Sequence, residues 1–165
     1  CNRTYGGVQG RVYSHQWPSN IPYYSTCVFS INAQNGSTVS IFFNSFIFPE
    51  STSCSEAAFE VRERSQSGTV LARYCGSALP NPVFSSSSTV WIQYFVRSEL
   101  ARGFDITYVT TAYGVGCGGD LFQTSGSFAS PYYPSNYSMD ADCRWRIRVP
   151  ATLQIQLDFP GKNLL

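Results

Sequence analysis

The sequence predicts an all-β sandwich. Its 165 residues include 12 Phe, 11 Tyr and 3 Trp, and aromatic side chains favour the pleated, half-buried surface of a sheet. The 13 Gly and 9 Pro supply turns. No window shows the 3.6-residue apolar period of an amphipathic helix, whereas short alternating segments recur at turn spacing. This pattern is typical of packed antiparallel sheets.

A repeat divides the chain into one unit and the opening of another. A shift of 116 residues superimposes Cys, Gly, Pro and apolar strand positions without a gap. The aligned pairs include Cys1 and Cys117, Gly10 and Gly126, Ser14 and Ser130, Cys27 and Cys143, Ile31 and Ile147, and Phe43 and Phe159. Agreement at one offset indicates a repeated folding unit. We therefore expect a first domain at 1–110, a linker at 111–116 and the truncated N-terminal part of a second domain at 117–165.

Alternation of apolar and polar residues places the strands of the first unit. The predicted strands are Arg11–Tyr13, Val28–Asn32, Thr38–Phe43, Ala58–Arg62, Thr69–Tyr74, Thr89–Val96 and Gly103–Thr110. Asn35-Gly36 predicts a hairpin turn, and the segments 15–24 and 79–88, rich in Pro with aromatics or Ser, predict loops. The second unit is expected to supply about four strands and to leave sheet edges open.

Cysteine usage and sequons indicate an oxidising, extracellular compartment. The six Cys are interpreted as disulfides, because a zinc site normally needs closely spaced Cys pairs and often His, and the only His is His15. Three Asn-x-Ser/Thr sequons, at Asn2, Asn35 and Asn136, predict N-glycosylation. No apolar run is as long as a membrane span, so we expect no membrane insertion in this segment. The net charge of +1 implies no nucleic-acid partner.

No arrangement of residues predicts catalysis. His15 has no local carboxylate and nucleophile to complete a triad, and Pro131 occupies the matching position of the second unit. Glu60 and Glu63 lie among Arg62 and Arg64 and are interpreted as a solvated charged face. We therefore predict that the chain is not an enzyme and needs no cofactor.

Three segments of the second unit resemble the CUB domain family. They are Cys117-Gly118-Gly119, the run from Gly126 to Pro134, and Cys143-Arg144-Trp145-Arg146-Ile147. The first unit is more diverged at its opening but resembles the family in its later half, from Leu71 to Tyr108. The resemblance implies a jelly-roll sandwich with the disulfides Cys1–Cys27, Cys54–Cys75 and Cys117–Cys143.

The same resemblance bears on calcium. Many CUB domains bind Ca²⁺ through three acidic residues, which then orient a basic side chain of a protein partner. Transferred position by position, these acids would lie at Pro49, Ala57 and Arg97, none of which is a carboxylate. A hard cation needs several oxygen ligands, so we expect no metal in the first unit.

A surplus of aromatic residues indicates a candidate ligand surface. Trp91 alternates with Val90, Ile92 and Tyr94, so it is expected to face away from the core. The candidate ligand-binding residues are Trp91, Trp17, Tyr23, Tyr24 and Arg97. Exposed aromatics near Arg are typical of binding hot spots. The alternative is that these rings pack against the neighbouring unit or cap one end of the sandwich.

The leading hypothesis is a non-catalytic interaction segment of a larger secreted or cell-surface glycoprotein. Its expected partners are a protein or glycan ligand and neighbouring CUB or other extracellular domains of the same chain. The first alternative is the non-catalytic CUB region of an extracellular astacin-like or complement-like protease. The second is a structural assembly element, in which the open second unit pairs its edges with another chain, including a second copy of this one.

Overall fold

The chain folds into strands joined by turns and loops. A computed structural model describes residues 1–97, 99–112, 116–137, 139 and 141–159. The elements are β1 (Arg3–Gly6), β2 (Gln9–Tyr13), β3 (Ser25–Asn32), β4 (Thr38–Ile47), the 3-10 turn η1 (Thr52–Cys54), β5 (Ala57–Glu63), β6 (Val70–Tyr74), β7 (Val83–Phe84), β8 (Thr89–Val96), β9 (Gly103–Thr111), β10 (Gly119–Leu121) and β11 (Trp145–Ile147). Within these ranges no helix is long and apolar enough to cross a membrane.

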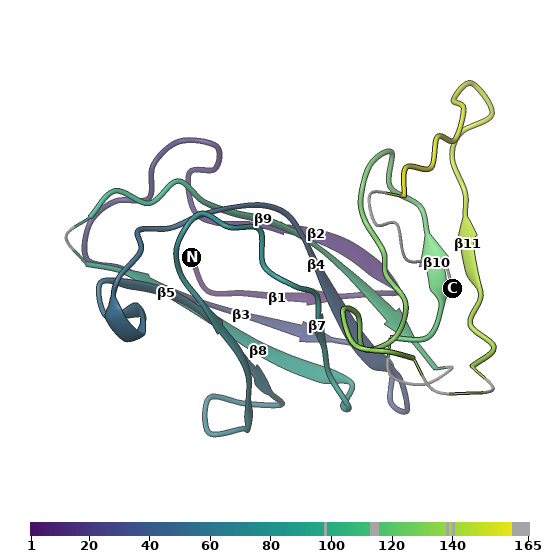
Figure 1. Cartoon of the computed structure of the whole chain (residues 1–165), viewed down its shortest axis with the longest axis horizontal. Helices are drawn as coiled ribbons and strands as arrows, with labels where there is room; N and C mark the ends of the chain where they lie inside the picture. The colour runs from purple at the N-terminus through teal and green to yellow at the C-terminus, as the bar shows by residue number, and fades with distance from the viewer. Residues whose placement is uncertain (98, 113–115, 138, 140, 160–165) are drawn as a thin grey trace.

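Two sheets form the sandwich of the first unit, as Figure 1 shows. One has five strands in the order β1-β3-β8-β5-β6, and the other has four in the order β2-β9-β4-β7. All neighbours pair antiparallel except β1, which runs parallel to β3. β8 is the middle strand of the larger sheet and pairs along its full length with β3. The prediction of an all-β antiparallel sandwich is confirmed.

Aromatic rings from both sheets meet in the core. Phe59 of β5 and Phe104 of β9 lie 4.8 Å apart between ring centroids, and Phe43 of β4 lies 5.5 Å from Phe59. Tyr94 of β8 contacts Phe104 at 5.6 Å. Edge-to-face pairs of this kind add to the stabilisation that comes from burying apolar area. Three disulfides join Cys1 to Cys27, Cys54 to Cys75 and Cys117 to Cys143, the pairs that the family resemblance implied.

Two short strands were not predicted from the sequence, and the described part of the second unit has fewer strands than were predicted. β1 lies before the first predicted strand, in a segment where no strand was predicted, and its partner β3 is more than twenty residues away in the chain. β7 lies in the segment predicted to be a loop and is held by only two residue pairs with β4. Both strands are defined by tertiary pairing, which local periodicity cannot show. In the described part of the second unit there are two strands, β10 and β11, and not the four expected.

The internal repeat is preserved in three dimensions. β10 pairs parallel with β11 in the register Gly119 to Trp145, which is the register Arg3 to Phe29 of β1 and β3 shifted by 116 residues. The loop after β2 repeats as well. The Trp17 N–H donates to the Ser14 carbonyl at 3.2 Å, and the Tyr133 N–H donates to the Ser130 carbonyl at the same distance. The second unit therefore begins with the local structure of the first.

The second unit packs on the outer face of the four-stranded sheet. A second apolar cluster joins Phe42 of β4 and Val109 of β9 to Leu121 of β10. The partly buried members of this cluster are Phe84, Phe128, Ala129, Trp145 and Ile147. Polar contacts border the cluster, because the Arg11 guanidinium donates to the Ser125 hydroxyl at 3.3 Å and the Phe122 N–H donates to the Gln9 side chain at 2.5 Å. In Figure 1, β10 and β11 stand to the right of the sandwich.

We predict that Phe42→Ala loosens the second unit from the first. Phe42 is nearly fully buried, and its removal leaves a cavity under β10, so the free energy of unfolding should fall by about 3 kcal/mol. Limited trypsin digestion should then cut faster at Arg144, Arg146 and Arg148, which are exposed. Tyr24→Ala, at an exposed residue outside this cluster, is the control. Unchanged cleavage of the Phe42 variant would contradict the proposed packing.

Candidate functional site

The predicted ligand residues separate into two places. Trp17, Tyr23 and Tyr24 lie in the loop between β2 and β3, and Arg97 directly follows β8. The Tyr24 N–H donates to the Arg97 carbonyl at 3.0 Å, so the loop and the end of β8 lie side by side. Trp91 lies near the other end of β8, on its outer face. The structure therefore brings Tyr24 and Arg97 together and separates Trp91 from them along the strand.

The loop between β2 and β3 is held from beneath. The Ile21 N–H donates to the Ala101 carbonyl at 2.8 Å, and the Ile21 side chain is buried in the core. The His15 N–H donates to the Tyr94 hydroxyl at 3.0 Å. Burial raises the pKa of Tyr94 and outweighs the opposing effect of that hydrogen bond, so the phenol stays neutral. His15 is therefore a loop residue, and the hydrogen bond that holds it comes from its backbone N–H.

Two guanidinium groups lie against one aromatic ring at this end of the sheet. The Cζ of Arg73 lies 5.8 Å from the Phe95 centroid, and the Cζ of Arg97 lies 5.7 Å from it. Beside them Tyr24 is 82% exposed and has a left-handed backbone, with φ of 56°. A bulky residue in this region of φ is uncommon and tends to occur at functional sites. We call Tyr23, Tyr24, Arg73, Phe95 and Arg97 the arginine-aromatic surface.

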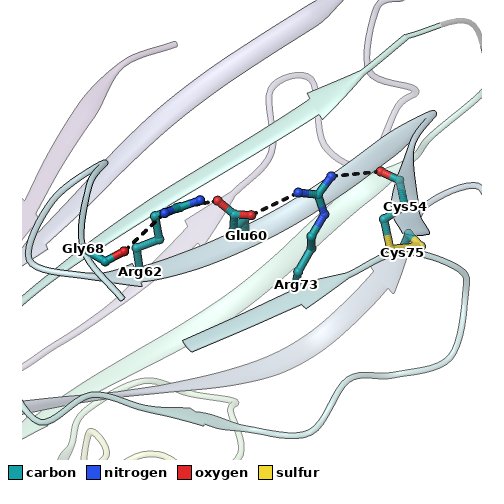
Figure 2. A network of polar contacts seen from close by, with 6 residues as sticks. All are labelled: Cys54, Glu60, Arg62, Gly68, Arg73 and Cys75. Carbon is teal, nitrogen blue, oxygen red and sulfur yellow. Dashed lines mark hydrogen bonds and ion pairs between the residues drawn. A yellow bond between two sulfur atoms is a disulfide. The ribbon is translucent and has the colours of Figure 1, made fainter. Parts of the chain in front are cut away.

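Arg73 belongs to a polar network on the outer face of the five-stranded sheet. Glu60 of β5 accepts hydrogen bonds from the Nε of Arg62 at 2.6 Å and from an Nη of Arg73 at 3.2 Å. As Figure 2 shows, Arg62 also donates to the Gly68 carbonyl, and Arg73 donates to the Cys54 carbonyl. The network thus links the turn between β5 and β6 to the disulfide loop.

The prediction of a solvated charged face for Glu60 and Glu63 is wrong. Glu60 is only 9% exposed, because the two arginine side chains extend over it. Glu63 accepts hydrogen bonds from the Ser86 N–H at 2.7 Å, the Ser86 hydroxyl at 3.0 Å and the Ser87 hydroxyl. Burial raises the pKa of Glu63, but these bonds outweigh it and the net pKa is lowered. Both carboxylates are structural.

Arg97 differs from Arg73 in its electrostatic environment. Arg73 divides its guanidinium between the Glu60 carboxylate and a backbone carbonyl. No carboxylate of the described residues lies within ion-pair distance of Arg97, whose guanidinium lies against the Phe95 ring. The surface therefore carries an exposed, uncompensated positive charge beside an aromatic platform.

The positions of the family calcium ligands do not fit a metal. Ala57 is fully buried opposite Val96 and has only a methyl side chain. Pro49 offers no side-chain oxygen, and its carbonyl already accepts the Gly76 N–H at 3.2 Å. Arg97 is a cation, which would repel another. Across the part of the chain that the structure describes, no three His, Cys, Asp or Glu residues are grouped as a metal site would require.

The sequons lie on exposed backbone. Asn2 precedes β1, Asn35 is in the turn between β3 and β4, and Asn136 is in the loop before β11. All three asparagines are exposed. Ser138, which completes the third sequon, lies outside the described residues, as do residues 113–115 of the predicted linker.

Arg73 and Phe95 were not among the residues predicted from the sequence. Phe95 could have been found, because it alternates with Tyr94 and Val96 in the same way as Trp91 and so faces outward. Arg73 could not, because its position depends on the pairing of β5 with β6, which aligns Glu60 with Arg73.

The fold and its three disulfides define a β-sandwich module of extracellular proteins. A family model described as "CUB domain" matches residues 1–108 and 117–164, and the chain therefore belongs to the CUB family. Its sequence is 37% identical over 161 residues to cubilin from Canis lupus familiaris and 35% identical to human cubilin. It is also 34% identical to a bone morphogenetic protein 1 homolog from Strongylocentrotus purpuratus.

Each of these matches covers 96% of this chain. The chain in turn spans 4% of either cubilin and 24% of the sea urchin protein. The cubilins and the bone morphogenetic protein 1 homolog thus match nearly the whole of this chain, and in each the match is to a part of a longer protein.

Solved structures show the same fold. The extracellular region of zebrafish Gpr126 matches with a TM-score of 0.62 and 25% identity, covering 68% of this chain and 15% of that one. The MASP-1 CUB2 domain bound to Ca²⁺ matches with a TM-score of 0.56 and 23% identity, covering 65% of this chain and 96% of that one. The CUB1-EGF-CUB2 region of rat MASP-1 gives 0.60 and 17% identity, covering 93% and 73%.

We predict that Glu60→Ala lowers the free energy of unfolding by about 2 kcal/mol, because it leaves two arginine groups over a largely buried position without their carboxylate. Glu60→Gln keeps an acceptor oxygen, so it should lower the free energy of unfolding by less than Glu60→Ala does. Chemical denaturation measures both. The network would have no structural role if the Ala variant matched the unsubstituted protein.

Proposed function

We propose that this chain is a non-catalytic binding segment of a longer extracellular protein, with two CUB units at about 1–110 and from 117 onward. CUB domains are generally non-catalytic modules that mediate interactions. The ligand surface of the first unit is the arginine-aromatic surface, and it acts without Ca²⁺. The observation that carries this proposal is Arg97, which is exposed, unpaired by any described carboxylate and stacked against Phe95.

The chemistry of this surface favours a ligand that presents a carboxylate. A guanidinium forms paired hydrogen bonds to a carboxylate, and the Phe95 ring beneath it excludes water from one side. Tyr24 adds an exposed aromatic side chain with a polar tip. An acidic side chain of a protein and an acidic sugar of a glycan both supply this chemistry. Where a calcium-binding member presents acids and a metal to a basic partner, this unit presents a base to an acidic one.

The relatives indicate two kinds of longer protein that could contain such a segment. Cubilins and tolloid-like proteins both contain this pair of units at 30% identity or more. A protease as the parent protein would place the same surface next to a catalytic domain elsewhere in the longer chain. In either setting the binding role proposed here belongs to the first unit.

We predict that Arg97→Glu lowers binding to an acidic probe by about tenfold or more, because it replaces an attractive charge with a repulsive one. The probes are a glutamate-rich peptide and matched sialylated and desialylated glycans on one array. Binding of the peptide alone indicates a protein ligand, and loss of binding on desialylation indicates a glycan. Binding to neither probe, or equal binding by the variant, overturns the proposed ligand chemistry.

The matched control is Arg64→Asn. Arg64 is exposed at the opposite end of β8 from Arg97, where its N–H donates to the Thr89 carbonyl. Its φ is 62°, a left-handed value that Asn tolerates better than most residues, so the exchange removes a positive charge with little backbone cost. This variant should bind the probes as the unsubstituted chain does.

We predict that Ca²⁺ leaves the backbone around Pro49, Ala57 and Arg97 unchanged. Hydrogen exchange of the whole chain, read peptide by peptide with added Ca²⁺ and with chelator, separates this region from the second unit. Equal protection under the two conditions is expected, since these side chains offer no ligand oxygen. Protection that rises with Ca²⁺ at residues 48–57 would show that the first unit binds the ion.

A further inference from the structure

The first sequon lies on the outer face of the five-stranded sheet. The Val28 N–H donates to the Oδ1 of Asn2 at 3.2 Å, which places Asn2 beside β3. Two residues on, the Thr4 hydroxyl lies 3.0 Å from the Ser30 hydroxyl. Side chains two apart on a strand share a face, and Ser30 is paired with Trp91, whose side chain is on the outer face. Asn2 and Trp91 are therefore on the same face of the sheet.

The side-chain amide of Asn2 leaves its nitrogen free to carry a glycan in the folded chain. Its oxygen accepts the Val28 N–H, and its Nδ2 group makes no hydrogen bond to a described residue, on a residue that is exposed. Nδ2 is the atom that carries an N-linked glycan. Transfer from a lipid-linked diphosphate oligosaccharide forms the bond from Nδ2 to C1 of the first sugar, breaks the C1–O bond to the diphosphate and releases one Nδ2 proton. The lipid diphosphate is the leaving group.

Trp91 presents a large, half-buried indole to the same face. It lies between Ser30 of β3 and Arg62 of β5, with Gln93 two positions along β8. Rings elsewhere in the core pair with one another, but no ring of a described residue stacks on Trp91. Its outward side is thus an apolar surface surrounded by hydrogen-bonding groups, the chemistry that accepts a sugar ring.

The distance from Asn2 to Trp91 suits the first sugars of an N-linked glycan. Trp91 is two strands across from β1, or about 10 Å, and two residues along the strand, or about 7 Å, which gives a separation of about 12 Å. Val28 and Gln93 lie between them on the same face. The two sugars nearest the asparagine span this gap.

We propose that Asn2 carries an N-linked glycan whose proximal sugars lie across Val28 and Gln93 and stack on Trp91. The glycan then forms a fixed part of the first unit and covers the centre of the five-stranded sheet. Trp91 is a glycan-packing residue and not a ligand residue, and the open part of this face is the arginine-aromatic surface at the other end of β8. The proposal stands independently of the ligand proposed for that surface.

The second sequon of the first unit supplies a matched control. Asn35 lies in the turn closed by the Ser37 N–H and the Gln34 carbonyl at 3.0 Å, next to Gly36. The prediction of a hairpin at Asn35-Gly36 is wrong, because β3 and β4 belong to different sheets and this turn crosses from one sheet to the other. A glycan at Asn35 therefore projects from one end of the sandwich and not across a sheet face. Its removal should leave Trp91 unaffected.

The test is a double-mutant cycle in the full chain secreted from eukaryotic cells. Peptide mapping by mass spectrometry first establishes the occupancy of Asn2. Asn2→Gln is then made with and without Trp91→Thr, which introduces a residue type that suits a strand. We expect loss of the glycan to lower Tm by about 2–4 °C more when the tryptophan is present than in the Trp91→Thr background. Asn35→Gln should shift Tm equally in both.

Two results overturn the proposal. One is an unmodified Asn2 in the secreted protein. The other is an equal Tm shift for Asn2→Gln in both backgrounds, which would show that the glycan and Trp91 act independently. Asn2→Gln also removes the hydrogen bond from Val28. This loss occurs in both the Trp91 and the Trp91→Thr background, so it cancels when the two Tm shifts are compared. Acrylamide quenching of tryptophan fluorescence gives a second readout, since removing the Asn2 glycan should expose Trp91 in a folded protein.

Discussion

Pairing of β8 with β3 on one side and β5 on the other sets the places of Trp91, Phe95 and Arg97. Because side chains alternate along a strand, this single register sends Ile92 and Tyr94 into the core and Trp91 and Phe95 outward. It also carries Arg97 to the end of the sheet, where the loop before β3 meets it. A shift of one residue would exchange core and surface along the whole strand.

Burial of apolar residues also decides how the two units meet. Phe128, Trp145 and Ile147 match Val12, Phe29 and Ile31 by the 116-residue shift, and in the first unit those positions are buried in the core. In the second unit the same positions pack on Phe42 and Val109 of its neighbour. Burial of apolar surface lowers the free energy of the folded chain whichever neighbour covers that surface. The outer face of the four-stranded sheet is consequently an internal contact, which leaves the outer face of the five-stranded sheet uncovered by the described part of the second unit.

Charge on that solvent-facing sheet is arranged in two different ways. Glu60 neutralises Arg62 and Arg73 in a network that joins the β5–β6 turn to the disulfide loop, so these groups support the fold. Arg97 has no such carboxylate among the described residues. The family resemblance implies that calcium-binding members carry an acid near this position. In the function proposed above, a reversal of charge at one position changes the partner from basic to acidic while the scaffold is retained.

Composition, alternation and the repeat determined by themselves that the chain is an all-β sandwich with a second unit begun, and its motifs resembled the CUB family closely enough to imply three disulfide pairs. They also placed Trp91 outside the core, because a period of two is a local property. Only the tertiary structure decided that Tyr24 and Arg97 are neighbours, that Glu60 is covered by two arginines, and that Asn2 shares a face with Trp91. These relations, like the strands β1 and β7, depend on pairing between segments far apart in the chain. Local periodicity carries no information about which strand lies next to which.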